Sequence, residues 1–153
     1  MASLERVPLV VGVIQTRGAT ALVYRGDDGI DKLTTTGHSH IWEVSRGFVT
    51  EHDLDPTDLG LARADIQSLL GADATHNAAV ARAVLAGEEG PVRDIVLLNA
   101  AGGLAAYELS QNPELLQEPI VDRLAVQLAR AASVIDSGAA AAKLDEWVAA
   151  TNR

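Results

Sequence analysis

The chain has 153 residues, 48% of them hydrophobic, with a formal net charge of −9 and no cysteine. This length fits about one domain with a core that needs no cross-links. The lack of cysteine excludes disulfides and thiolate metal sites, and it fits a cytoplasmic protein. The acidic balance and the scattered Lys and Arg residues argue against a nucleic-acid partner. No apolar run approaches the roughly 20 residues of a membrane span, so no membrane partner is expected.

The first third of the chain alternates helix and strand signals. Apolar residues at helical spacing predict a helix over 4–17, with Gly18 at its end. The short apolar run 19–25 predicts a buried strand, and a helix so close before it predicts an α/β unit with a parallel sheet. Two further strand-like runs, 40–44 and 48–54, flank the turn at 45–47 and predict an antiparallel hairpin.

From residue 75 onward the chain is predicted to be helical. Helices are expected over 75–86, from Pro91 onward, over 114–136 and around 144–148. The first helix places Ala78, Ala81, Val84 and Leu85 on one face, and the inner face of the second is expected to hold Ile95, Leu98, Asn99 and Gly102. The third repeats Val121, Leu124, Ala125, Leu128, Ala132 and Ile135, and the last carries Leu144, Trp147 and Val148. No repeat or long linker interrupts residues 1–153, so one folding unit is predicted. One strand and a hairpin make a thin sheet for these helices, which predicts that partner strands are missing.

The loop 26–37, with the sequence GDDGIDKLTTTG, follows the predicted strand 19–25 and holds three carboxylates, Asp27, Asp28 and Asp31. The carboxyl end of a strand in an open α/β sheet is a common ligand site. Mg²⁺ takes one or two carboxylates and completes its shell with water and phosphate oxygens. Asp and Gly are also ordinary turn residues, so a plain loop is the alternative.

Other polar residues have both a functional and a structural interpretation. His38 and His40 could lie on one strand face and bind zinc if His52, His76 or a carboxylate supplied a third ligand; the alternative is surface polarity. Asn99, in the middle of a predicted helix, is expected to be a hydrogen-bonded core amide. The pair Gly102–Gly103 weakens that helix and is expected to permit close backbone packing.

Three stretches together resemble one enzyme family. They are ALVYRGDDGIDKLTTTG (21–37), GADATHNAAVARAVLAGEEGPVRDIVLLNAAGGLAA (71–106) and SVIDSGAAAAKLDEWVAATN (133–152). In order and spacing they are similar to the carboxyl-terminal part of anthranilate phosphoribosyltransferase, an enzyme of tryptophan biosynthesis. The resemblance implies part of an α/β domain of the nucleoside phosphorylase and phosphoribosyltransferase type, with a partial central sheet, a β-hairpin and several carboxyl-terminal helices.

The family transfers a phosphoribosyl group from phosphoribosyl pyrophosphate to anthranilate, with Mg²⁺ bound. The resemblance places the family's metal-binding aspartate and glutamate at Asp31 and Lys32, so the second carboxylate is replaced by an ammonium group. Either metal binding is weakened here, or the ammonium itself neutralises part of the pyrophosphate charge. The family's glycine-rich phosphate loop and anthranilate-contacting arginine have no counterpart, so no catalytic residue is assigned in this chain.

Two functions follow as hypotheses. The first is an enzyme part, inactive alone and completed by a missing amino-terminal half or by a homo-oligomer. The second is a non-catalytic packing domain that keeps the fold without the chemistry, as the exchange at Lys32 suggests. A pyrimidine-nucleoside phosphorylase, which shares the broad architecture, is a more distant third.

Overall fold

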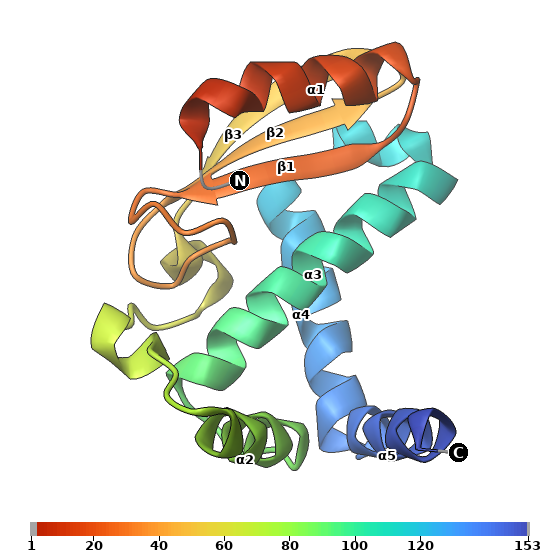
Figure 1. The fold of residues 1–153 in the computed structure, drawn as a ribbon. Coiled ribbons are helices and arrows are strands. Elements are labelled where there is room, and N and C mark those ends of the chain that lie inside the picture. The colour runs from red at the N-terminus through yellow and green to blue at the C-terminus, as the bar shows by residue number, and fades with distance from the viewer. Residues whose placement is uncertain (1–2, 153) are drawn as a thin grey trace.

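The structure is a computed structural model, and it describes residues 3–152. Its helices and strands are α1 (Val7–Thr16), β1 (Ala21–Gly26), β2 (Ser39–Ser45), β3 (Phe48–Leu54), α2 (Ala74–Leu85), α3 (Pro91–Gln111), α4 (Ile120–Asp136) and α5 (Ala139–Thr151). Short 3₁₀ helices are η1 (Leu4–Arg6), η2 (Pro56–Leu59), η3 (Ile66–Leu69) and η4 (Pro113–Gln117). Figure 1 shows α1 on one face of the sheet, α3 and α4 below the other face, and α2 and α5 at their far ends. The α/β fold class is confirmed.

The sheet is antiparallel throughout, so the prediction of a parallel sheet is wrong. Its order is β1-β2-β3, with Ala21 opposite Val44 and Ser45 opposite Phe48. Parallel neighbours need a crossover of a dozen or more residues that usually contains a helix. The connection 27–38 contains no helix or strand, and the chain returns antiparallel beside β1.

The predicted hairpin is confirmed. β2 and β3 are joined by a two-residue turn, Arg46–Gly47, in which both residues have positive φ values, +51° and +80°. Such a turn has the twist that matches the right-handed twist of the flanking strands. Arg46 is the one residue other than glycine with positive φ in the part of the chain that the structure describes.

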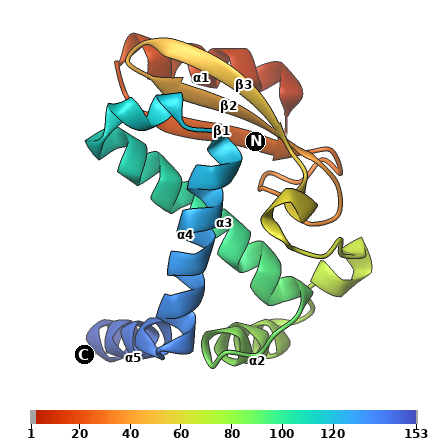
Figure 2. The same cartoon turned by 180° about the vertical axis from the view of Figure 1, so that it is seen from behind.

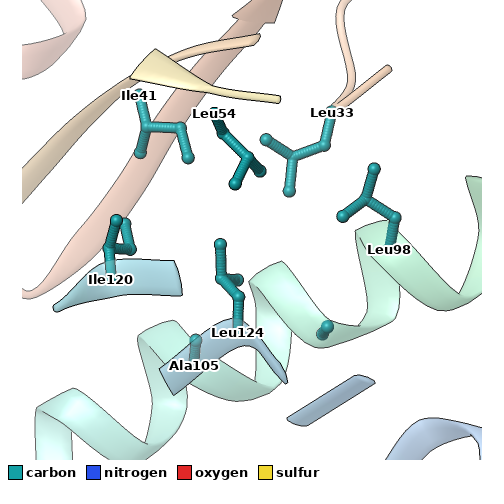
Figure 3. Close-up of a cluster of buried hydrophobic side chains, with 8 residues drawn as sticks. Leu33, Ile41, Leu54, Leu98, Ala105, Ile120 and Leu124 are labelled. Carbon is teal, nitrogen blue, oxygen red and sulfur yellow. The ribbon is translucent and has the colours of Figure 1, made fainter. Parts of the chain in front are cut away.

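Two hydrophobic clusters hold α1, α3 and α4 to the sheet. Above it, Val7 and Val11 of α1 pack on Val23 and Val44. Below it lies the larger cluster, shown in Figure 3, made of Leu33, Ile41, Leu54, Leu98, Ala101, Ala105, Ile120 and Leu124. The lower cluster joins two strands, the loop after β1 and two helices, and so fixes where that loop lies.

The predicted helices are present, with two differences. The helix expected over 114–136 is divided, because η4 ends at Gln117 and α4 begins after Pro119. Proline cannot donate the backbone hydrogen bond that a continuous helix needs there. In α2, Val84 of the predicted apolar face is buried, but Ala78 and Ala81 of the same face are exposed, since α2 lies at the margin of the molecule.

Figure 2, the view from behind, places α4 and β3 on the side of the molecule opposite to α3 and β1. No helix within residues 3–152 is both long enough and apolar enough to cross a lipid bilayer.

Candidate functional site

The loop that follows β1 is organised by Asp28. Its carboxylate accepts hydrogen bonds from the hydroxyl groups of Thr34 and Thr36, each at 2.6 Å, and from the backbone N–H of Ile30 at 2.9 Å. Partial burial acts to raise the pKa of Asp28, but these hydrogen bonds outweigh it, and the pKa lies below its usual value. Asp28 therefore closes the loop and does not present a free carboxylate to a ligand.

Asn99 ties the same loop to α3. Its side-chain oxygen accepts from the backbone N–H of Leu33 at 3.0 Å, and its amide nitrogen donates to the carbonyls of Leu33 at 2.8 Å and Ile95 at 2.9 Å. The predicted hydrogen-bonded amide is confirmed. The amide pairs with both backbone groups of Leu33 as a neighbouring strand would, and so positions the residues just before it, Asp31 and Lys32.

Of the two adjacent glycines, Gly102 explains the close approach of α3 to this region. A Cβ at Gly102 would lie 3.1 Å from Leu33 and 3.5 Å from the ring of Tyr24. The prediction of close packing is thus confirmed at Gly102. At Gly103 a Cβ would meet no atom within 4 Å, so the prediction is wrong at that position.

Asp31 and Lys32 form an ion pair on the open surface of the loop. The Lys32 ammonium lies 2.6 Å from the Asp31 carboxylate, and both side chains are more than half exposed, 54% and 57% respectively. The hydrogen bond from Lys32 and its positive charge lower the pKa of Asp31. Tyr24 lies close by: burial, followed by the negative charge of Asp31, raises the pKa of its hydroxyl group.

The residues that the structure describes do not form a metal site. Within residues 3–152 no group of three or more His, Asp or Glu side chains is placed to hold a metal ion. Asp28 is engaged inside the loop, and Asp31 is paired with an ammonium group. A carboxylate already neutralised by a neighbouring cation is a poor ligand for a divalent cation.

The histidines do not converge on one point, contrary to the zinc hypothesis. His38 lies 2.6 Å from Asp53, His40 lies 2.8 Å from Glu51, and His52 lies 3.0 Å from Glu43. The hydrogen bond with Asp53 raises the pKa of His38. Each of these imidazoles thus has a carboxylate partner of its own, which is a structural pairing across strands or loops.

Sequence reasoning missed the residues that shape this site. Thr34 and Thr36 bind Asp28, and Tyr24 lies between the loop and α3. The run of three threonines six residues after an Asp-Asp pair was an available signal, because Asp and Thr often close loops on their own backbone. Tyr24 carried no such signal, since a tyrosine in an apolar strand is usually a core residue.

Known proteins resemble this chain over nearly its whole length. The family model for the a/b domain of the glycosyl transferase family matches residues 2–141. The anthranilate phosphoribosyltransferase of Leifsonia xyli is 71% identical over 151 residues, which are 99% of this chain and 43% of that protein. That of Arthrobacter sp. is 52% identical over 99% of this chain and 42% of its own length. The chain thus spans less than half the length of these relatives.

Solved structures agree with the sequence matches. The crystal structure of anthranilate phosphoribosyltransferase from Thermus thermophilus has 32% identity and a TM-score of 0.78, and the match covers 96% of this chain and 40% of that one. The enzyme of Saccharomyces cerevisiae in complex with PRPP and Mg has the same fold, with 20% identity, a TM-score of 0.77 and coverage of 94% and 39%. The resemblance read from the sequence is confirmed, and the chain belongs to the glycosyl transferase family, whose a/b domain it matches over residues 2–141.

Proposed function

We propose that this chain is part of a phosphoribosyltransferase that moves a phosphoribosyl group from phosphoribosyl pyrophosphate to the amino group of anthranilate, with release of pyrophosphate. The observation that carries the proposal is the 71% identity with an anthranilate phosphoribosyltransferase over 99% of this chain. A cytoplasmic location belongs to the same proposal and fits the lack of cysteine.

The transfer requires groups that residues 3–152 do not bring together. Its transition state resembles an oxocarbenium ion, so the leaving pyrophosphate must be stabilised while the attacking amine is held in line. The loop with Asp31 and Lys32 is open and largely exposed. We therefore assign to this chain one wall of the site, and to polypeptide outside these 153 residues the groups that enclose the substrates.

Within that wall, Lys32 is the residue assigned to the pyrophosphate. Its ammonium is exposed, and the loop that carries it is held by the hydrogen bonds between Asn99 and Leu33. A lysine ammonium acts as a compact charge for phosphate oxygens. Asp31 orients this ammonium at 2.6 Å. Mg²⁺ is bound in the yeast relative, and no step here is assigned to it, because the residues described do not form its site.

The test compares the isolated chain with the same chain mixed with the remaining part of a relative. The isolated chain is expected to consume no anthranilate, as followed by the fluorescence of anthranilate in the presence of phosphoribosyl pyrophosphate and Mg²⁺. Addition of the part of the Leifsonia xyli relative that lies outside the matched 151 residues is expected to restore consumption. Turnover by the isolated chain would disprove the one-wall assignment. A stable mixed complex without turnover would favour the non-catalytic packing domain.

A further inference from the structure

His38 closes the base of the loop that carries Asp31 and Lys32. The loop starts after β1 and ends where β2 begins, and the backbone N–H of Asp27 donates to the carbonyl of His38 at 2.9 Å. The Asp27 side chain lies at the same end of the loop, since a Cβ at Gly37 would be 3.8 Å from its own Cβ. Figure 1 shows the loop at the end of the sheet where β3 also ends. The contacts of the His38 side chain therefore decide how firmly the loop is closed.

The His38 imidazole lies between two carboxylates. Its Nδ1 lies 2.6 Å from Oδ1 of Asp53, and its Nε2 lies 3.5 Å from Oδ2 of Asp55. A neutral imidazole has one N–H donor and one bare nitrogen, whereas an imidazolium has two donors. Because both ring nitrogens face carboxylate oxygens, this arrangement favours the imidazolium form. His40, two residues later, is paired separately with Glu51.

Arg63 opposes the two carboxylates. Its guanidinium lies 2.7 Å from Asp55, and its positive charge disfavours a second cation nearby. The hydrogen bond with Asp53 is the largest influence on His38. Together with the negative charges of both carboxylates it outweighs partial burial and Arg63, so the pKa of His38 lies above its usual value of 6.5.

Asp55 connects His38 to a second segment that binds the loop. Arg63, which pairs with Asp55, belongs to the stretch 61–65 after η2. In the same stretch, the backbone N–H of Ala64 donates to the carbonyl of Thr35 at 2.9 Å. Protonated His38 thus completes a connected row of charges from the loop to this stretch, whereas neutral His38 has no charge with which to join it.

We propose that His38 is a pH-sensitive clamp on the loop: as an imidazolium it holds the end of the loop to Asp53 and Asp55, and on losing its proton it releases that end. Release loosens the loop that presents Asp31 and Lys32. The effect on pyrophosphate binding by Lys32 rests on the proposed function, and the clamp itself does not.

The clamp holds at mildly acidic pH and opens as the pH rises. Because the pKa of His38 is raised in the folded protein, its contribution is complete below pH 6.5 and is lost as the pH passes through the folded-state value. By linkage, the equilibrium between the held and released loop end changes about tenfold for a difference of one in pKa between the two states. The His38 side chain is 44% exposed, so added salt is expected to weaken the clamp.

The experiment measures hydrogen exchange of the Asp27 amide, which is bonded to the His38 carbonyl, in the isolated chain at about pH 5.5 and about pH 8.5. Each rate is divided by the intrinsic exchange rate at that pH, so that only the opening of the bond is compared. NMR titration gives the pKa of His38 independently. Protection of Asp27 is expected to fall as the pH rises, by the factor that the measured pKa of His38 fixes, about tenfold for a value one above the usual one.

Two substitutions fix the charge state of the clamp. His38→Gln is neutral at every pH, and His38→Arg is charged at every pH and has donors for both carboxylates. Protection of Asp27 is expected to stay low across the pH range in His38→Gln and high in His38→Arg. His76→Gln makes the same change at an exposed histidine of α2 and is the matched control, which should keep the wild-type response.

A measured pKa of His38 at or below 6.5 would overturn the proposal, and so would protection of Asp27 that does not change with pH. A wild-type pH response in His38→Gln would place the titrating group elsewhere and would overturn it too. The wild-type comparison needs no substitution, so a variant that fails to fold does not prevent the test. Exchange is measured without phosphoribosyl pyrophosphate, so a chain that shows the clamp but supports no transfer would count against the proposed function alone.

Discussion

Arg123 of α4 donates two parallel hydrogen bonds to the carboxylate of Glu43 in β2, from Nη1 to Oε1 at 2.7 Å and from Nη2 to Oε2 at 2.8 Å. Both side chains are buried, with exposed fractions of 6% and 1%. The guanidinium also donates through Nε to the carbonyl of Glu118, and His52 lies 3.0 Å from the same carboxylate. This pair joins the start of α4 to the middle strand across 80 residues of sequence.

Removing one member of this pair is expected to destabilise the protein strongly. Arg123→Met leaves the Glu43 carboxylate buried without its cation, and such a change costs about 3–5 kcal/mol in the free energy of unfolding. The double variant Glu43→Leu/Arg123→Met removes both charges and is expected to recover much of that loss. Urea unfolding of Arg123→Met, Glu43→Leu and the double variant measures the coupling free energy between the two side chains. If the losses in free energy of unfolding of the two single variants add up to the loss of the double variant, Glu43 and Arg123 do not stabilise the fold as a pair.

Asn99→Ala is expected to loosen the loop that carries Asp31 and Lys32. The change leaves both backbone groups of Leu33 without their partner, and each buried polar group left unsatisfied costs about 1–3 kcal/mol. Amide hydrogen exchange should show faster exchange at Leu33. Asn112→Ala, at an exposed asparagine beyond the end of α3, is the control and should leave that amide unchanged. An unchanged rate of hydrogen exchange at the Leu33 amide in Asn99→Ala would show that Asn99 does not hold the loop.

Two glycine-to-alanine changes should shift the melting temperature in opposite directions. A Cβ at Gly26 would lie 2.5 Å from an Asp28 carboxylate oxygen and 2.9 Å from Ile30 and Thr34, so Gly26→Ala must displace the loop. At Gly12, inside α1, a Cβ would meet nothing within 4 Å, and alanine is favoured over glycine there by up to about 1 kcal/mol. Melting temperatures are therefore expected to fall for Gly26→Ala and to rise for Gly12→Ala. A rise for both would mean that the loop adapts without strain.

Titration of the Asp55 carboxyl group makes the free energy of unfolding depend on pH in the acid range. Its carboxylate accepts from the backbone N–H of Thr57, and this bond, with the Thr57 side chain and Arg63, lowers the pKa of Asp55 from 3.8 to about 2. Because the folded-state pKa is lowered, the contribution of Asp55 is complete above pH 3.8 and is lost as the pH falls toward about 2. Asp55→Asn keeps an acceptor for Thr57 but cannot titrate, so it should flatten this part of the profile. NMR titration giving Asp55 an ordinary pKa would refute the assignment.

Lys32→Glu should change how the protein responds to Mg²⁺. The exchange removes the ammonium beside Asp31 and provides a second carboxylate, the pair of ligands that Mg²⁺ accepts together with water and phosphate oxygens. Calorimetry of the isolated chain should show tighter Mg²⁺ binding, and the completed enzyme should need less Mg²⁺ for half-maximal rate. Lys32→Met removes the charge without adding a ligand and separates the two effects. Unchanged Mg²⁺ dependence in Lys32→Glu would count against a pyrophosphate role for Lys32.

Local patterns predicted the elements well and their arrangement less well. The hairpin turn at Arg46–Gly47, the start of α3 at Pro91 and the apolar rows of α3 and α4 follow from spacing and turn chemistry. The strand direction of β1 and β2 did not, because it depends on what the loop 27–38 does in three dimensions. The family resemblance identified Asp31 and Lys32 as a candidate pair, but local sequence patterns could not show that Asp28 is engaged by Thr34 and Thr36.

Because of the hydrogen bonds between Asn99 and Leu33, a movement of α3 would also move the loop that carries Lys32. Asn99 holds the loop with Lys32, and Gly103, one turn along the same helix, faces outward. A rigid helix transmits a small tilt along its whole length. A force on α3 near Gly103 would therefore change the position of Lys32.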